Sequence, residues 1–86
     1  MIIFKEPIPD KALSEHVIAT EQVPNEGSCR VKCYLEPNCV SINVGPGTKA
    51  GQLTCELNNH TDESSSGKQI LLKETPGFTH YSVEVI

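Results

Sequence analysis

The fold of this chain is decided by one stretch of sequence, CRVKCYLEPNCVSINV, which occupies residues 29–44. Three of the four cysteines lie in it, at Cys29, Cys33 and Cys39, and the fourth, Cys55, follows in the segment LTCEL. The 86 residues suffice for a single domain, and 37% hydrophobic residues with no Trp give that domain only a thin core. A core this small usually needs covalent or metal staples, and the four cysteines are the staples at hand.

The cysteine-rich stretch begins inside a predicted helix. Asn25 is a suitable N-cap, and Glu26 suits the positive end of the helix dipole. Because Pro37 cannot continue a helix, the predicted helix spans residues 26–35. A helix of this length is marginal in isolation and needs tertiary contacts to form.

The rest of the chain is predicted to consist of strands and loops. CVSINV (39–44) and LTCEL (53–57) alternate with a period of two, which predicts an antiparallel hairpin across the Gly45-Pro46-Gly47 turn. The further expectations are strands at 16–20 and 80–86, a short strand at 2–4, an extended arm at 1–11, a polar loop at 58–68 and a turn at Pro76-Gly77. One helix, a hairpin and a terminal strand predict a single α+β domain over residues 1–86, which we interpret as a module excised from a larger protein.

The cysteines favour disulfides, because their number is even and the chain is short and rich in Ser, Thr, Asn and Pro. Pairing Cys29 with Cys33 inside a helix is awkward, since their Cβ vectors run parallel. Two arrangements that pin the helix to the sheet remain, Cys29–Cys39 with Cys33–Cys55 or Cys29–Cys55 with Cys33–Cys39. We prefer the second, which closes the turn after the helix and ties its first turn to the hairpin.

A zinc site is the competing interpretation of the same cysteines. The spacings C-x3-C, C-x5-C and C-x15-C lack the paired knuckles of structural zinc sites. His16, His60 and His80 are distant single residues, which we interpret as solvated side chains. No metal and no other cofactor is therefore expected, and a small zinc-binding domain stays the less favoured alternative.

The run Cys29-x3-Cys33-x5-Cys39-Val40-Ser41-Ile42-Asn43, followed by Cys55-Glu56-Leu57-Asn58-Asn59, resembles the PAN/apple domain family. The resemblance is densest over residues 25–59, and a terminal strand with Tyr81-x-Val83 fits it as well. It implies a curved antiparallel sheet of about five strands that cradles one short helix, with Cys29–Cys55 nested around Cys33–Cys39. The apple subgroup has a further disulfide between the two ends of the domain. This chain looks like the two-disulfide PAN core of invertebrate multidomain extracellular proteins, which leaves the termini held by strand pairing alone.

Charge and motifs exclude several classes of function. The formal net charge is −4 and the basic residues are scattered, whereas nucleic acids and anionic membranes require a concentrated positive field. The sequence offers no signal peptide and no run of about 20 apolar residues, so we expect no membrane insertion and an export signal that was removed or lies in a longer precursor. Motifs such as G-x-S-x-G and H-E-x-x-H are missing, and we expect no enzyme.

The resemblance implies a non-catalytic adhesion module, secreted or part of an ectodomain, that binds an extracellular protein or carbohydrate. Asn59-His60-Thr61 is an N-glycosylation sequon, so Asn59 is a candidate glycan acceptor. Arg30 and Lys32 on the predicted helix are candidate ligand-binding residues for a sulfated sugar. The alternative function is a structural component of an extracellular matrix, including a mineralised one.

Overall fold

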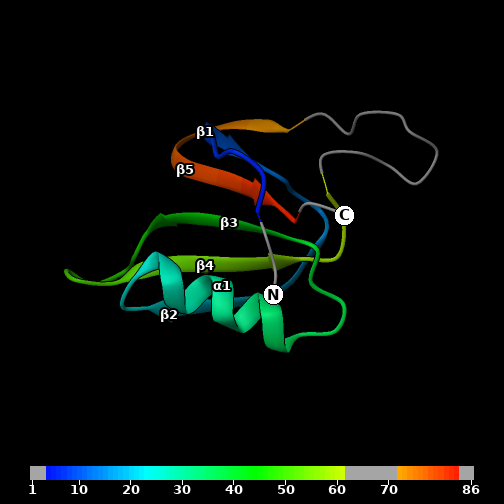
Figure 1. Ribbon diagram of the computed structural model, residues 1–86. Helices are drawn as coiled ribbons and strands as arrows, with labels where there is room; N and C mark the ends of the chain where they lie inside the picture. The colour runs from blue at the N-terminus through cyan, green and yellow to red at the C-terminus, as the bar shows by residue number, and fades with distance from the viewer. Residues whose placement is uncertain (1–3, 62–71, 84–86) are drawn as a thin grey trace.

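The computed structural model describes residues 4–61 and 72–83 of the chain. It contains six elements, in the order β1 (Ile8–Ala12), β2 (Val17–Val23), α1 (Glu26–Leu35), β3 (Ser41–Pro46), β4 (Leu53–Asn58) and β5 (Lys73–Ser82) (Figure 1). The strands form one five-stranded antiparallel sheet with the order β1-β5-β3-β4-β2. α1 packs on one face of this sheet, against β2, β3 and β4. The predicted α+β fold, an antiparallel sheet with one short helix, is confirmed.

The helix has the bounds predicted from its flanking residues. The Asn25 side chain accepts a hydrogen bond from the Ser28 backbone N–H at 2.9 Å, which satisfies one of the donors left free at a helix start. At the other end, the Glu36 N–H bonds back to the carbonyl oxygens of Lys32 and Cys33, at 3.1 and 3.2 Å. Pro37 then prevents a further turn.

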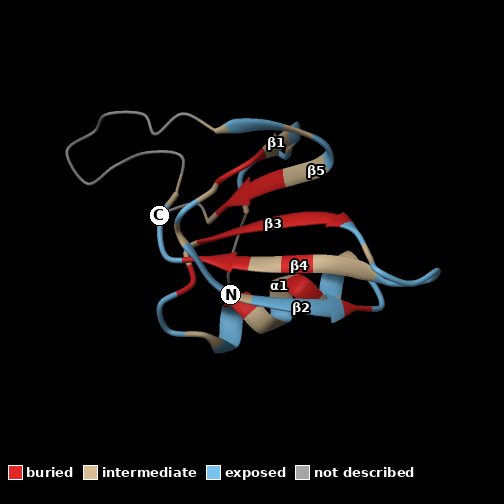
Figure 2. Ribbon diagram, turned by 180° about the vertical axis from the view of Figure 1, so that it is seen from behind, coloured by how far each residue is buried: buried red, intermediate tan, exposed pale blue. Residues whose placement is uncertain are grey.

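The hairpin supplies four residues of the hydrophobic core, Ile42, Val44, Cys55 and Leu57. β3 and β4 pair antiparallel with Ile42 opposite Leu57 and Val44 opposite Cys55, so these side chains share the face that α1 covers. β3 is buried along nearly its whole length, whereas the edge strand β2 is mostly exposed (Figure 2). The core consists of Val23, Cys29, Cys33, Cys39, Ile42, Val44, Cys55, Leu57 and Tyr81.

Both disulfides connect the helix to its surroundings. Cys29 is bonded to Cys55 with a Cα–Cα distance of 5.5 Å, and Cys33 to Cys39 with 5.2 Å. The first joins the beginning of α1 to the middle of β4, and the second closes the turn between α1 and β3. This is the nested arrangement preferred above, and it leaves none of the four cysteines free to bind zinc.

The strands differ from their predicted bounds. β3 is Ser41–Pro46 rather than 39–44, so Gly45 and Pro46 of the predicted turn belong to the strand. The expected arm at 1–11 contains a real strand, β1, which tolerates Pro9 because it is a sheet edge, where one side of the backbone needs no partner. β2 runs on to Val23 rather than ending at residue 20. Of the short strand expected at 2–4 only Phe4 is described, and it forms an isolated bridge with Val83. The expected strand at 80–86 is the end of β5, and residues 84–86 lie outside the described part.

The turn expected at Pro76-Gly77 is wrong, because these residues lie inside β5. The pairing of β1 with β5 shifts register between Pro9 and Lys11, so the extra residues of β5 form a bulge. Gly77 has φ of 88° there, a conformation that glycine adopts without strain, and its N–H donates to Asp10 Oδ1 at 3.1 Å. Pro76 and Gly77 therefore belong to a bulge within β5 and do not form a turn that ends the strand.

A buried polar cluster occupies the sheet face opposite α1. Asn43 of β3 is fully buried and holds the segment after β1 through two bonds to the Leu13 backbone, at 3.0 Å to its N–H and 2.8 Å to its carbonyl. The same side chain contacts Glu56 Oε1 at 3.0 Å and His80 Nδ1 at 2.8 Å. His80 is 0% exposed, so its interpretation as a solvated histidine is wrong.

Candidate functional site

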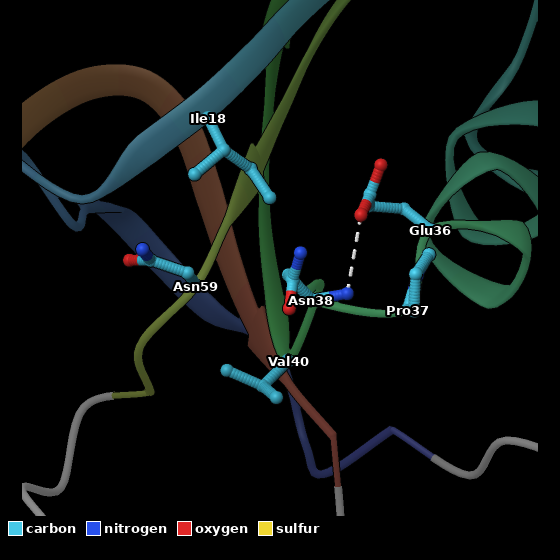
Figure 3. Close-up of a pocket in the computed structure, with 6 residues that line it drawn as sticks. All are labelled: Ile18, Glu36, Pro37, Asn38, Val40 and Asn59. Atoms are coloured by element: carbon cyan, nitrogen blue, oxygen red, sulfur yellow. Dashed lines mark hydrogen bonds between the residues drawn. The ribbon is translucent and has the colours of Figure 1, made fainter.

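A hollow of about 620 Å³ opens where the end of α1 meets the edge of the sheet. Figure 3 shows its lining side chains, which come from β2, from the turn after α1, from the residue before β3 and from the residue after β4. They are Ile18, Glu36, Pro37, Asn38, Val40 and Asn59. The site thus combines neighbouring residues of one turn with residues of strands that are distant in the sequence.

A second hollow of about 260 Å³ lies beside the first and shares Glu36 with it. Its lining comes from α1, β2 and β4, namely Ala19, Glu21, Lys32, Leu35, Glu36 and Leu57. We call the two hollows together the α1–β2 groove. The two hollows therefore meet at Glu36.

The groove is held open by covalent and backbone bonds. The Cys33–Cys39 disulfide spans the turn that carries Glu36 and Asn38. Within that turn the Cys39 N–H bonds to the Glu36 carbonyl at 3.0 Å, and the Asn38 N–H bonds to Glu36 Oε1 at 3.2 Å (Figure 3). Val40 is fixed to β4 by its N–H, which donates to the Asn58 carbonyl at 2.9 Å. These bonds preform one wall of the groove.

The opposite wall depends on an irregularity in β2. The pairing register of β2 with β4 shifts between Val17 and Ala19, which places Ile18 in a bulge. Ile18 lines the groove although it is 41% exposed, and Leu35 on the helical side is 71% exposed. Val31 and Tyr34 add exposed apolar surface to the adjoining face of α1. These exposed apolar side chains therefore gather around a concave part of the surface.

The polar groups of the groove are suited to binding. The amides of Asn38 and Asn59 and the carboxylate of Glu36 offer hydrogen bonds at the larger hollow. Lys32 Nζ pairs with Glu21 Oε1 at 2.9 Å in the smaller one. None of the residues that line the two hollows is a histidine, a cysteine or a hydroxyl residue.

Arg30, a candidate ligand residue, has partners within the molecule. Its guanidinium lies over the rings of Phe4 and Tyr81, at 5.3 and 5.1 Å from their centroids, and pairs with Glu26 at 3.1 Å. The Tyr81 hydroxyl donates to Glu26 Oε1. Burial, and then the hydrogen bond and negative charge of Glu26, raise the pKa of Tyr81 above its ordinary value of 10.0. Phe4 is thereby held by side chains as well as by strand pairing.

The other sequence-predicted residues lie at or near the groove. Lys32 lines its smaller hollow and Asn59 its larger one, where Asn59 is exposed. Ligand contact by Arg30 and Lys32, and glycosylation of Asn59, stay predictions. Ile18, Leu35 and Glu36 were missed, because their proximity depends on strand order and on the bulge in β2. The sequence does show three large hydrophobic residues at helical spacing, Val31, Tyr34 and Leu35, on a helix face away from Cys29 and Cys33. This pattern could have indicated an apolar surface beside the groove.

The fold defines a class of protein, a small α+β module stapled by two disulfides, and the groove is an open hollow on its surface. A family model described as PAN domain matches residues 6–84, and the chain belongs to this family. Comparison with curated proteins and with solved structures gives no significant match. PAN domains generally bind proteins or carbohydrates and are typically non-catalytic. Among residues 4–61 and 72–83, no helix is long and apolar enough to cross a membrane.

Proposed function

We propose that this PAN domain is a non-catalytic extracellular adhesion module that binds a protein or a glycan through the α1–β2 groove. The observation that carries the proposal is the exposed apolar pair Ile18 and Leu35, placed on the two sides of a concave site. Membership of the PAN family and the two disulfides support an extracellular location, since such bonds persist in oxidising compartments.

The groove needs little reorganisation to accept a partner. Its helical side is tied to the sheet by Cys29–Cys55, and the turn at its end is closed by Cys33–Cys39. A preformed site loses less conformational entropy on binding than a flexible one. The scaffold therefore supports specific recognition even in a domain of this size.

The lining accommodates the two kinds of partner that the family binds. Aliphatic side chains of a protein segment can pack on Ile18 and Leu35, while the Asn38 amide and the Glu36 carboxylate bond to its polar groups. The same amide and carboxylate can bond to the hydroxyl groups of a sugar. Asn59, at the rim, is the proposed glycan acceptor of the module itself.

The experiment uses oxidised protein, immobilised and probed with a glycan array and with extracellular extracts. Ile18→Arg places a charge in the groove, and Thr20→Arg is the matched control because Thr20 is exposed on the same strand outside the groove lining. We expect Ile18→Arg to lose the bound partner or glycan and Thr20→Arg to keep it. Silence of the wild type in both assays, or equal binding by the two variants, contradicts the proposal.

A further inference from the structure

Two histidines from distant parts of the chain lie ring to ring beside the sheet. His16 directly precedes β2 and His60 closely follows β4, and the antiparallel pairing of these strands brings the two residues together. Their ring centroids are 4.2 Å apart, and the ring planes are tilted by 49°. The interpretation of the two as distant single residues is therefore wrong.

The backbone of both histidines is fixed. The Asn59 N–H donates to the His16 carbonyl at 3.0 Å, which continues the β2–β4 ladder beyond the last paired residues. The Ser41 hydroxyl donates to the His60 carbonyl and so connects His60 to β3. The proximity of the rings thus follows from the sheet and not from a chance approach of two free side chains.

Both rings are open to solutes, since His60 is exposed and His16 is half-buried. Imidazole nitrogen is the commonest protein ligand for metal ions and suits Zn²⁺, Cu²⁺ and Ni²⁺. Mg²⁺ and Ca²⁺ prefer oxygen ligands, which this pair does not offer. The four cysteines cannot compete for a metal ion because all are disulfide-bonded.

We propose that His16 and His60 form a two-histidine site for a divalent transition-metal ion, with Cu²⁺ bound more tightly than Zn²⁺. Tilted rings in contact need only side-chain rotation to turn one nitrogen each toward a shared ion. Among residues 4–61 and 72–83, no third His, Cys, Asp or Glu joins them. The site lies beyond the proposed groove function and stands without it.

The test is a titration of oxidised, unglycosylated protein with Zn²⁺, followed by the ring resonances of its three histidines in NMR spectra. We expect the His16 and His60 signals to shift together and to saturate at one ion per chain. His80 is the internal control, because it is buried and bonded to Asn43 and Ser82, and its signals should not move. Calorimetry should give tighter binding for Cu²⁺ than for Zn²⁺ and no heat for Mg²⁺ or Ca²⁺.

Variants separate a shared site from two independent surface ligands. His16→Asn should abolish the Zn²⁺-induced shift of His60, and His60→Asn, which preserves the sequon, should abolish that of His16. Glu15→Gln, next to His16 but outside the pair, should bind as the wild type does. The proposal is overturned by absence of binding, by shifts confined to one ring, or by wild-type affinity in either histidine variant, each measured on protein with unchanged circular dichroism.

Discussion

At the scale of single residues, Arg30 is the clearest case of a side chain whose role the structure redefines. Its guanidinium is stacked against Phe4 and Tyr81 and paired with Glu26, so it joins the beginning of the described chain to α1 and β5. A planar, delocalised cation suits such stacking better than an ammonium group does.

Arg30→Ala should therefore lower the free energy of unfolding by about 1–2 kcal/mol, the sum of two partly exposed cation–π contacts and one helical ion pair. Urea denaturation of oxidised protein measures the change. Lys32→Ala is the matched control, since its ion pair with Glu21 is exposed and contributes about 0–1 kcal/mol. Arg30→Lys should recover only part of the loss. Equal effects of Arg30→Ala and Lys32→Ala would show that the stacking contributes nothing.

Tyr81 gives the same cluster a dependence on pH. Its pKa is raised in the folded protein, first by burial and then by Glu26, so the fold favours the protonated phenol. A group with a raised folded pKa stabilises the protein fully below its unfolded pKa, and this contribution is lost as the pH rises through the folded pKa. We expect wild-type stability to fall above about pH 10 more steeply than that of Tyr81→Phe.

The cause of the shift can be checked on the residue itself. In NMR titrations of the Tyr81 ring carbon, Glu26→Gln should lower the pKa but leave it above the ordinary value, because burial remains. Glu74→Gln, an exposed carboxylate on β5, is the control and should change nothing. An unchanged Tyr81 pKa in Glu26→Gln would remove Glu26 as a cause.

At the scale of elements, the two disulfides close loops of different length, with sequence separations of 26 and 6. On the chain-entropy account, Cys29–Cys55 contributes up to about 3.6 kcal/mol and Cys33–Cys39 up to about 2.4 kcal/mol. We expect Cys29→Ala/Cys55→Ala to be the more destabilised double variant in urea denaturation. The reverse order would show that local constraint of the turn outweighs loop length.

The pairing itself is checked by mass spectrometry. Intact oxidised protein should be about 4 Da lighter than the reduced chain, since each disulfide removes two hydrogens. Peptide mapping should find Cys29 with Cys55 and Cys33 with Cys39. Reduced thiols in protein purified in air, or Cys29 linked to Cys39, would contradict the structure.

Elements were predictable where local signals suffice. The cap at Asn25 and the stop at Pro37 define α1, and period-two alternation defines the β3–β4 hairpin. β1 was hidden because Pro9 argues against a strand until its position at the sheet edge is known. Pro76-Gly77 indicated a turn because turns and bulges favour the same residue types. Only the pairing of β5 with β1 on both sides of these residues shows that they form a bulge.

At the scale of the whole molecule, the groove could not be predicted from the sequence, although the disulfide framework around it could. Its two sides meet because β2 pairs with β4 at the sheet edge, a long-range contact that no local pattern encodes. The buried face opposite α1 was missed for a related reason. Asn43 and His80 alternate with core residues along their strands, which is the pattern of a solvated face.

That buried face holds the segment that connects the two edge strands of the sheet. β1 and β2 lie at opposite edges of the sheet, so the segment between them must cross it, and Asn43 on the central strand β3 binds Leu13 in that segment. Because Asn43 Oδ1 already accepts the Leu13 N–H, His80 must carry its proton on Nδ1 to donate to the same oxygen. One amide thus fixes the crossing segment, the imidazole tautomer and a carboxylate of β4.

Asn43→Ala should consequently cost about 2–4 kcal/mol in the free energy of unfolding, because it removes the side-chain partner of the buried Leu13 N–H and one hydrogen bond of the buried His80 imidazole. Hydrogen exchange of the Leu13 amide should accelerate more than that of the Cys55 amide in β4, since the crossing segment loosens before the disulfide-bonded hairpin does. Asn38→Ala, an exposed amide, should change stability by less than about 0.5 kcal/mol. If Asn43→Ala lowers the free energy of unfolding no more than Asn38→Ala does, the sheet and its two disulfides hold the crossing segment without help from the buried polar cluster.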